Sequence, residues 1–190
     1  MLVTIIIIII IIVVLVLLAG FVVVGFNRLR RQNVRVNEAL GGIDVQLTRR
    51  ADLIPNLVNT VRGYTQHERG VLENVTAART EVQKAAQNGT VEEKSAAQTK
   101  LDKAIVDVLA VAEAYPDLKA STNFTQLQQA LTDTENQLSF ARQYYNDAAA
   151  TLNTSIATIP WMFFAGLAGV KQRDFYQAPD SNQTPPTVSF

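Results

Sequence analysis

Cysteine is absent from the 190-residue chain, and histidine occurs only once, at His67. Without cysteine the protein can form no disulfide, no thiol nucleophile and no thiolate metal site. A single histidine excludes a histidine metal cluster, and His67-Glu68 lacks the second histidine of the HExxH zinc pattern. We therefore predict no metal and no other cofactor, and we interpret His67 as an exposed helix residue.

An excess of charge of either sign is also lacking, because the 17 basic and 17 acidic residues cancel. Nucleic-acid-binding domains present a basic surface, so we expect no nucleic-acid partner. The chain contains no glycine-rich phosphate loop and no GxSxG nucleophile turn. These absences predict a protein that is not an enzyme.

Polar side chains are nearly missing from residues 2–26, where Thr4 is the one exception. A helix of this length rises about 37 Å, which exceeds the roughly 30 Å hydrocarbon core of a bilayer. A cleaved secretory signal would have a basic start, a shorter apolar stretch and a small-x-small cleavage site, none of which this segment shows. Residues 1–26 are therefore predicted to form a transmembrane anchor.

Arginines follow this apolar run directly, at Arg28, Arg30, Arg31 and Arg35, and the first acidic residue is Glu38. Basic residues beside a span stay on the cytoplasmic side. We predict a single-pass protein of the cell membrane, with a short N-terminus outside and the remainder in the cytoplasm. Contact of these arginines with anionic headgroups is compatible with that orientation.

Between residues 27 and 159, glycine and proline are sparse and apolar residues recur at intervals of three and four, which predicts an all-α helical bundle. One apolar stripe keeps this spacing from Val36 to Val82, except between Val61 and Val71. Pro55 allows two interpretations: Asp52 caps a new helix that turns back, or one long helix kinks. Further helices are expected over 92–115, after the break at 88–90, and over 123–159, with a capping box at Asn123 and a stop at Pro160.

The segment at residues 160–176 follows the bundle, and its first part, 161–170, carries no charge. Ten residues are too few to span a bilayer. The segment therefore either lies at the membrane interface or places its aromatic side chains over the end of the bundle core. The membrane-proximal residues would be Arg28, Arg30, Arg31, Trp161, Phe163 and Phe164. Residues 177–190 are predicted to form a flexible tail unless Val188 and Phe190 dock.

Long matches in the bundle region resemble the LemA family. They comprise VQLTRRADLIPNLV at residues 45–58, YPDLKA at 115–120, and PTVSF at 186–190. The resemblance implies one N-terminal span with an outside N-terminus, a cytoplasmic four-helix bundle of up-and-down type, and no established biochemical activity. The chain departs from the usual pattern at Trp161-Met162 and at Gly41-Gly42.

Four polar residues follow one another along the last predicted helix at steps of seven, four and seven: Glu135, Arg142, Asn146 and Asn153. This spacing places them on one helix face beside the apolar stripe. Their expected partners lie near Pro55, and we predict the pairs Arg50–Glu135 and Asp52–Arg142. Such a cluster either fixes the helix register through ion pairs, the commoner outcome, or binds a charged ligand. The candidate residues are Arg49, Arg50, Asp52, Asn56, Glu135, Arg142, Asn146 and Asn153.

Two adjacent glycines, Gly41 and Gly42, lower the stability of a helix, so either a close helix contact or a hinge should require them. The leading hypothesis for function is a membrane-anchored scaffold or adaptor that forms a homo-oligomer or binds a partner protein. The alternative is a membrane-tethered sensor of an anionic ligand or lipid headgroup. Arginines already neutralised by carboxylates would favour the scaffold, whereas arginines facing an open cavity would favour the sensor.

Overall fold

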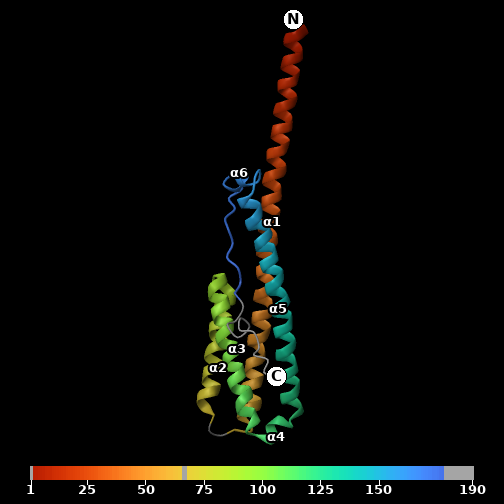
Figure 1. Cartoon of the computed structure of the whole chain (residues 1–190). Coiled ribbons are helices and arrows are strands. Elements are labelled where there is room, and N and C mark those ends of the chain that lie inside the picture. Colours follow the sequence, from red (N-terminus) through yellow and green to blue (C-terminus); the bar gives the residue numbers. More distant parts are fainter. Residues whose placement is uncertain (1, 66–67, 178–190) are drawn as a thin grey trace, which may run out of the picture. The chain divides into compact units, whose positions relative to one another are not determined.

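The computed structural model describes residues 2–65 and 68–177, and this part of the chain contains helices but no strand. The all-α prediction is confirmed. His67 and the tail at 178–190 lie outside the described residues. The helices are α1 (Leu2–Arg62), α2 (Arg69–Asn88), α3 (Val91–Glu113), α4 (Pro116–Lys119), α5 (Thr122–Ala157) and α6 (Met162–Ala165), shown in Figure 1.

The chain divides into two compact units, and α1 and α5 contribute to both. Of the described residues, the anchor unit contains 2–38 and 147–173, and the bundle unit contains 39–65, 68–146 and 174–177. The boundaries expected at residues 26 and 159 stay predictions. Within the anchor unit, the first part of α1 is long and apolar enough, by length and composition, to cross a membrane.

Four long helical stretches build the bundle unit, namely the end of α1, α2, α3 and the first part of α5. They run alternately up and down, and α2 lies beside α3 (Figure 1). Apolar residues at helical spacing bury a common core, because each helix turns one stripe inward. Fully buried core side chains include Ile43, Leu47, Ile54, Leu57, Val82, Leu101, Val108 and Leu138. The four-helix bundle prediction is confirmed.

The first turn of the bundle lies after Arg62, where α1 ends, and not at Pro55. The interpretation in which Asp52 caps a new helix is therefore wrong. The helix ends as Gly63 donates its N–H to the carbonyls of Asn59 and Thr60, both at 3.3 Å. This turn falls within the interval from Val61 to Val71, where the apolar stripe loses its spacing.

A hydrogen bond from α2 explains how α1 continues through Pro55. Proline has no N–H, so the carbonyl of Ala51, four residues earlier, loses its partner within the helix. Nε of Arg79 donates to that carbonyl oxygen at 3.1 Å. Ala51 is fully buried, so water would have little access to the orphan acceptor. The arginine thereby offsets the local defect that the proline creates.

Replacing Arg79 with methionine is expected to lower the free energy of unfolding by about 1–3 kcal/mol, because the Ala51 carbonyl is left unsatisfied. In a Pro55→Ala background the N–H of residue 55 can bond that carbonyl, so the cost should shrink. Urea unfolding of the full chain in a mild non-ionic detergent measures both differences. Arg69→Met, at an exposed arginine of the same helix, is the matched control. An equal cost in both backgrounds would contradict the compensation.

The other helix ends follow local chemistry. Gly89 closes α2, where an added Cβ would come within 2.7 Å of the Ala85 carbonyl oxygen. Thr90 then caps α3 in a capping box with Glu93. The break predicted at 88–90 therefore lies between α2 and α3. α5 begins at Thr122, so Asn123 lies inside its first turn and is not the cap. α5 ends at Ala157, three residues before Pro160.

Candidate functional site

Four charged side chains from three helices form a buried network inside the bundle unit. Arg50 of α1 places Nη2 2.8 Å from Oδ1 of Asp102 on α3, and its Nη1 donates to Oε2 of Glu135 on α5 at 2.6 Å. Arg142, two turns further along α5, donates through Nη2 to Oε1 of Glu135 at 2.8 Å. The side chains of both arginines are at most 10% exposed. One carboxylate is therefore shared by two buried arginines.

Burial governs the electrostatics of this network. It raises the pKa of the Asp102 carboxyl above its usual value, although the positive charge of Arg50 opposes the rise. Two positive and two negative groups leave no net charge. Among the described residues, Nε of Arg50 and Nη1 of Arg142 have no hydrogen-bond acceptor. The arrangement has the properties of a structural ion-pair network, in which attraction offsets only part of the desolvation cost.

The sequence interpretation missed a polar stripe on α3 formed by Lys94, Gln98 and Asp102. Lys94 is buried, pairs with Asp44 of α1 and donates to the carbonyl of Ala86 at 3.0 Å. Gln98 is also buried and donates to Oδ2 of Asp102 at 3.2 Å. Lys94, Gln98 and Asp102 are each four residues apart and therefore share one helix face beside the apolar stripe. This spacing was the signal in the sequence that could have revealed them.

An extended segment, Asp174–Gln177, is bound to the bundle unit by side chains; we call it the C-terminal strap. The Asn146 amide accepts from the N–H of Tyr176 at 2.8 Å and donates to its carbonyl at 3.0 Å. Tyr145 donates its hydroxyl to the carbonyl of Asp174 at 2.8 Å. Asn146 thus holds a backbone segment and not a charged side chain.

The ring of Tyr176 is buried, and its hydroxyl donates to Oε1 of Gln98 at 2.9 Å. Burial raises the pKa of Tyr176, so the phenol stays a neutral donor. Because Gln98 also bonds Asp102, a hydrogen-bonded chain leads from the C-terminal strap to the charge network.

Asn153 of the anchor unit, like Asn146, binds both the N–H and the carbonyl of one backbone residue. Its side chain accepts from the N–H of Arg173 and donates to the carbonyl of the same residue, both at 2.8 Å. The guanidinium of Arg173 donates to Asn33 at 2.8 Å and to Asn37 at 2.9 Å, on α1. Asn153 therefore binds the chain that follows α6 and does not contact the charge network.

The structure brings together only some of the candidate polar residues. Arg50 meets Glu135 as expected, but Asp52 is exposed and does not reach the buried Arg142, so Asp102 supplies the second carboxylate. Arg49 is exposed, with Nη1 3.5 Å from Oε1 of Gln137. Asn56 is exposed as well and lines a polar groove between α1 and α5. The remaining two candidates, Asn146 and Asn153, have the contacts described above.

The membrane-proximal candidates lie in the anchor unit. Arg28, Arg30 and Arg31 are exposed on α1, and the guanidinium of Arg28 lies 4.7 Å above the ring of Trp161. Phe164 is buried, whereas Phe163 is exposed.

Comparison with known proteins places this fold in a family. The model of the LemA family matches residues 39–190, which include the whole charge network. The chain belongs to the LemA family. It is also similar to magnetosome protein MamQ 1 and MamQ 2 of Paramagnetospirillum magneticum, each 24% identical in a 165-residue alignment that covers 75% of this chain and 61% of theirs. MamQ of Magnetospirillum gryphiswaldense is 22% identical over the same shares.

This LemA family chain thus spans about three fifths of the length of the curated relatives it matches. Of the runs that resemble the family, residues 45–58 lie on α1 and residues 115–120 include α4, whereas residues 186–190 lie outside the described residues. In the described part of the chain, no three His, Cys, Asp or Glu residues gather in a way that could hold a metal ion.

Proposed function

We propose that this LemA family protein is a membrane-anchored, non-enzymatic scaffold whose bundle unit self-associates at the cytoplasmic face of the membrane. The observation that carries the proposal is an exposed apolar stripe along α1 and α5 of the bundle unit. Its members are Gly41, Val45, Phe140 and Tyr144, and we call it the α1/α5 face.

The register of the two helices places these residues together. Arg49 lies near Gln137, and Asn56 shares a groove with Asn123. The two helices are therefore antiparallel, so residues nearer the start of α1 lie beside residues nearer the end of α5. One turn from the Arg49–Gln137 contact lie Val45 and Phe140, and one further turn brings Gly41 and Tyr144.

A second copy of the chain is the partner that best fits this face. The space around Gly41 and Gly42 is open, since an added Cβ would meet nothing within 4 Å at either position. Phe140 projects from the same face with 72% of its surface exposed. In a two-fold dimer the protruding ring of each copy can lie against the glycines of the other. Two anchors in one membrane would also raise the local concentration of the partners.

The pairing of the arginines argues against the alternative function as a sensor of an anionic ligand. Arg50 and Arg142 are buried and already face Asp102 and Glu135. An incoming anion would have to displace a carboxylate from a site with no net charge. The network therefore supports a role in holding the bundle together.

The orientation rests on the arginines that follow the apolar run of α1, because basic flanks stay in the cytoplasm. A cysteine introduced at the exposed Val106 tests it, since the chain has no cysteine of its own. A membrane-impermeant maleimide should label this site in opened cells only. Labelling in intact cells would place the bundle outside.

The mass of the full-length protein in mild detergent tests self-association. We expect a discrete oligomer, and we expect Phe140→Glu to shift it toward monomer, because a desolvated carboxylate opposes the contact. Val106→Glu, at a site on α3 with 62% exposure, is the matched control. A monomeric parent protein, or equal behaviour of the two variants, would refute the proposal.

Replacing Gly41 and Gly42 together with alanine should have two opposite effects. The monomer should gain roughly 2 kcal/mol of stability, because alanine restricts the unfolded chain and nothing within the bundle unit obstructs it. The oligomer should weaken, because the two added methyl groups occupy the space beside residues 41 and 42 in which Phe140 of the other copy would lie. Urea unfolding and light scattering measure the two effects. A stabilised variant that associates as strongly as the parent would leave only the hinge explanation for these glycines.

A further inference from the structure

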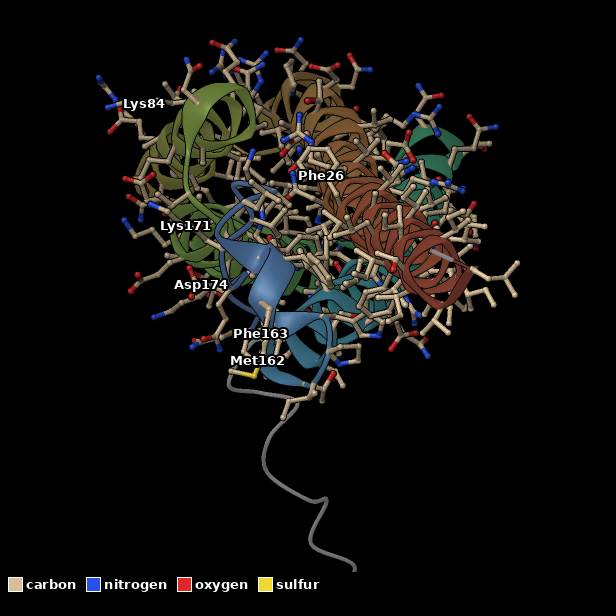
Figure 2. All side chains as sticks on the ribbon, turned by 90° about the horizontal axis from the view of Figure 1, so that it is seen from above. Phe26, Lys84, Met162, Phe163, Lys171 and Asp174 are labelled. Carbon is tan, nitrogen blue, oxygen red and sulfur yellow. The ribbon has the colours of Figure 1, made fainter. Side chains whose placement is uncertain are left out.

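A cluster of apolar side chains is exposed in the anchor unit, between the end of α5 and the turn after α6. Ile159, Met162, Phe163 and Leu167 are exposed, with 70% of Phe163 and 66% of Leu167 accessible to solvent. Figure 2 labels Met162 and Phe163 on the α6 segment. No charged residue occurs between Trp161 and Val170. Such a concentration of apolar surface marks an interaction site.

The opposite side of this segment packs on α1. The ring of Phe164 lies 5.5 Å from that of Phe21 in an edge-to-face arrangement, and the ring of Trp161 stacks on Phe21 at 5.9 Å. Gly25 makes room for Phe164, because an added Cβ would lie 2.7 Å from that ring. The segment is thus attached to one specific level of α1.

That level coincides with the end of the apolar run. Phe21 belongs to the uncharged residues 2–26, and Arg28 is the first charged residue after them. The guanidinium of Arg28 lies 4.7 Å above the ring of Trp161, so Trp161 bridges the last apolar turns and the first positive charge. Phe21 and Arg28 are separated by about 10 Å along the helix, at 1.5 Å per residue. Tryptophan is enriched at this boundary between hydrocarbon and headgroups.

We propose that residues 159–167 form a second membrane-contacting element, which inserts Phe163, Leu167 and their apolar neighbours into the interface of the bilayer that α1 enters. The proposal rests on the proposed anchor and adds a lipid surface as a ligand of the C-terminal segment. The apolar surface is continuous with the candidate span through Phe21, Trp161 and Phe164, which favours lipid over a protein partner. The exposed Arg30 and Arg31 are placed to face lipid phosphates.

Site-specific fluorescent labels on the full chain test the proposal, because the chain contains no cysteine. Phe163→Cys and Leu167→Cys would each carry an environment-sensitive nitrobenzoxadiazole label. Val106→Cys, at an exposed position on α3 of the bundle unit and outside the α1/α5 face, is the matched control, and Val13→Cys reports on the span. The protein is reconstituted into vesicles of phosphatidylcholine and phosphatidylglycerol, with or without nitroxide-bearing lipids.

We expect the labels at 163 and 167 to emit at shorter wavelength than the label at 106, and to be quenched by shallow nitroxides. If the label at 13 is quenched but those at 163 and 167 behave like the label at 106, the second contact is refuted and the anchor stands. If the label at 13 is not quenched either, the anchor and the second contact both fail. Blue-shifted labels that nitroxides do not quench would identify a protein contact and also refute the proposal.

A second measurement uses Trp161, the single tryptophan of the chain. In vesicles, Phe163→Ser combined with Leu167→Ser should shift its emission to longer wavelength and raise its quenching by acrylamide. Val106→Ser should leave both unchanged. An unchanged spectrum in the double variant would contradict insertion of this segment.

Discussion

Replacing Arg50 with methionine is expected to lower the free energy of unfolding by about 3–5 kcal/mol, the cost of breaking a buried ion pair by removing one partner. Methionine fills much of the same volume but leaves Asp102 and Glu135 without the cation between them. The pKa of Asp102 is already raised by burial, so its carboxylate is poorly solvated in the folded protein. The arginine is the main group that compensates for that burial.

Arg49→Met is the matched control for this prediction, because Arg49 is the adjacent residue and is exposed. Its long contact with Gln137 should contribute little, so its loss should change stability by less than about 1 kcal/mol. Urea unfolding of the full chain, followed by far-ultraviolet circular dichroism in a non-ionic detergent, measures both variants. Equal effects at the two positions would show that the buried network does not stabilise the bundle.

Replacing Asn146 with alanine is expected to cost about 2–4 kcal/mol, because the N–H and the carbonyl of Tyr176 both lose their partner. The C-terminal strap can avoid part of this cost by leaving the bundle and exposing its backbone to water. In that case the buried ring of Tyr176 also loses its apolar contacts and its hydrogen bond to Gln98. The effect should therefore appear first in the strap.

Amide hydrogen exchange distinguishes local release of the strap from global unfolding. We expect the Tyr176 amide to exchange roughly 30- to 1000-fold faster in Asn146→Ala, whereas the core amides of α3 change far less. Asn136→Ala, at an exposed asparagine of the same helix, should leave exchange at Tyr176 unchanged. If Asn146→Ala leaves it unchanged as well, the two hydrogen bonds do not hold the strap.

These two predictions assign the conspicuous polar residues of the family-matched region to the fold. Arg50 and Arg142 are paired with carboxylates between α1, α3 and α5, and Asn146 and Asn153 bind the segment after α6. Two surfaces that we propose for interaction, the α1/α5 face and the exposed side of residues 159–167, are apolar. Both suit contacts with another copy or with lipid better than they suit catalysis.

The helices and the apolar first part of α1 could be predicted from the sequence because each depends on short-range properties. Apolar spacing of three and four predicts which helix face is buried, and a long uncharged run needs no partner to be recognised. The contact between Arg50 and Glu135 was also predicted, since both flank the apolar stripe of their helix. These features depend on the order of residues within one helix.

Residues that depend on contacts between helices could not be located in this way. Pro55 is compatible with a break or with a kink, and the hydrogen bond that satisfies the Ala51 carbonyl comes from Arg79 on another helix, α2. Asp102 replaces Asp52 as the carboxylate because rotation of α3 turns Asp102 inward, whereas the phase of α1 leaves Asp52 exposed.

The sequence by itself determined that this chain is helical, carries an apolar run long enough for a membrane, and has no cysteine and a single histidine. Only the tertiary structure decided which charges are paired, where the first turn lies and what Asn146 and Asn153 bind. The physical reason is the separation along the chain over which each interaction acts. Helix periodicity and hydrophobicity act over a few residues, whereas a buried carboxylate or an orphan carbonyl is satisfied by whichever distant side chain the packing brings to it.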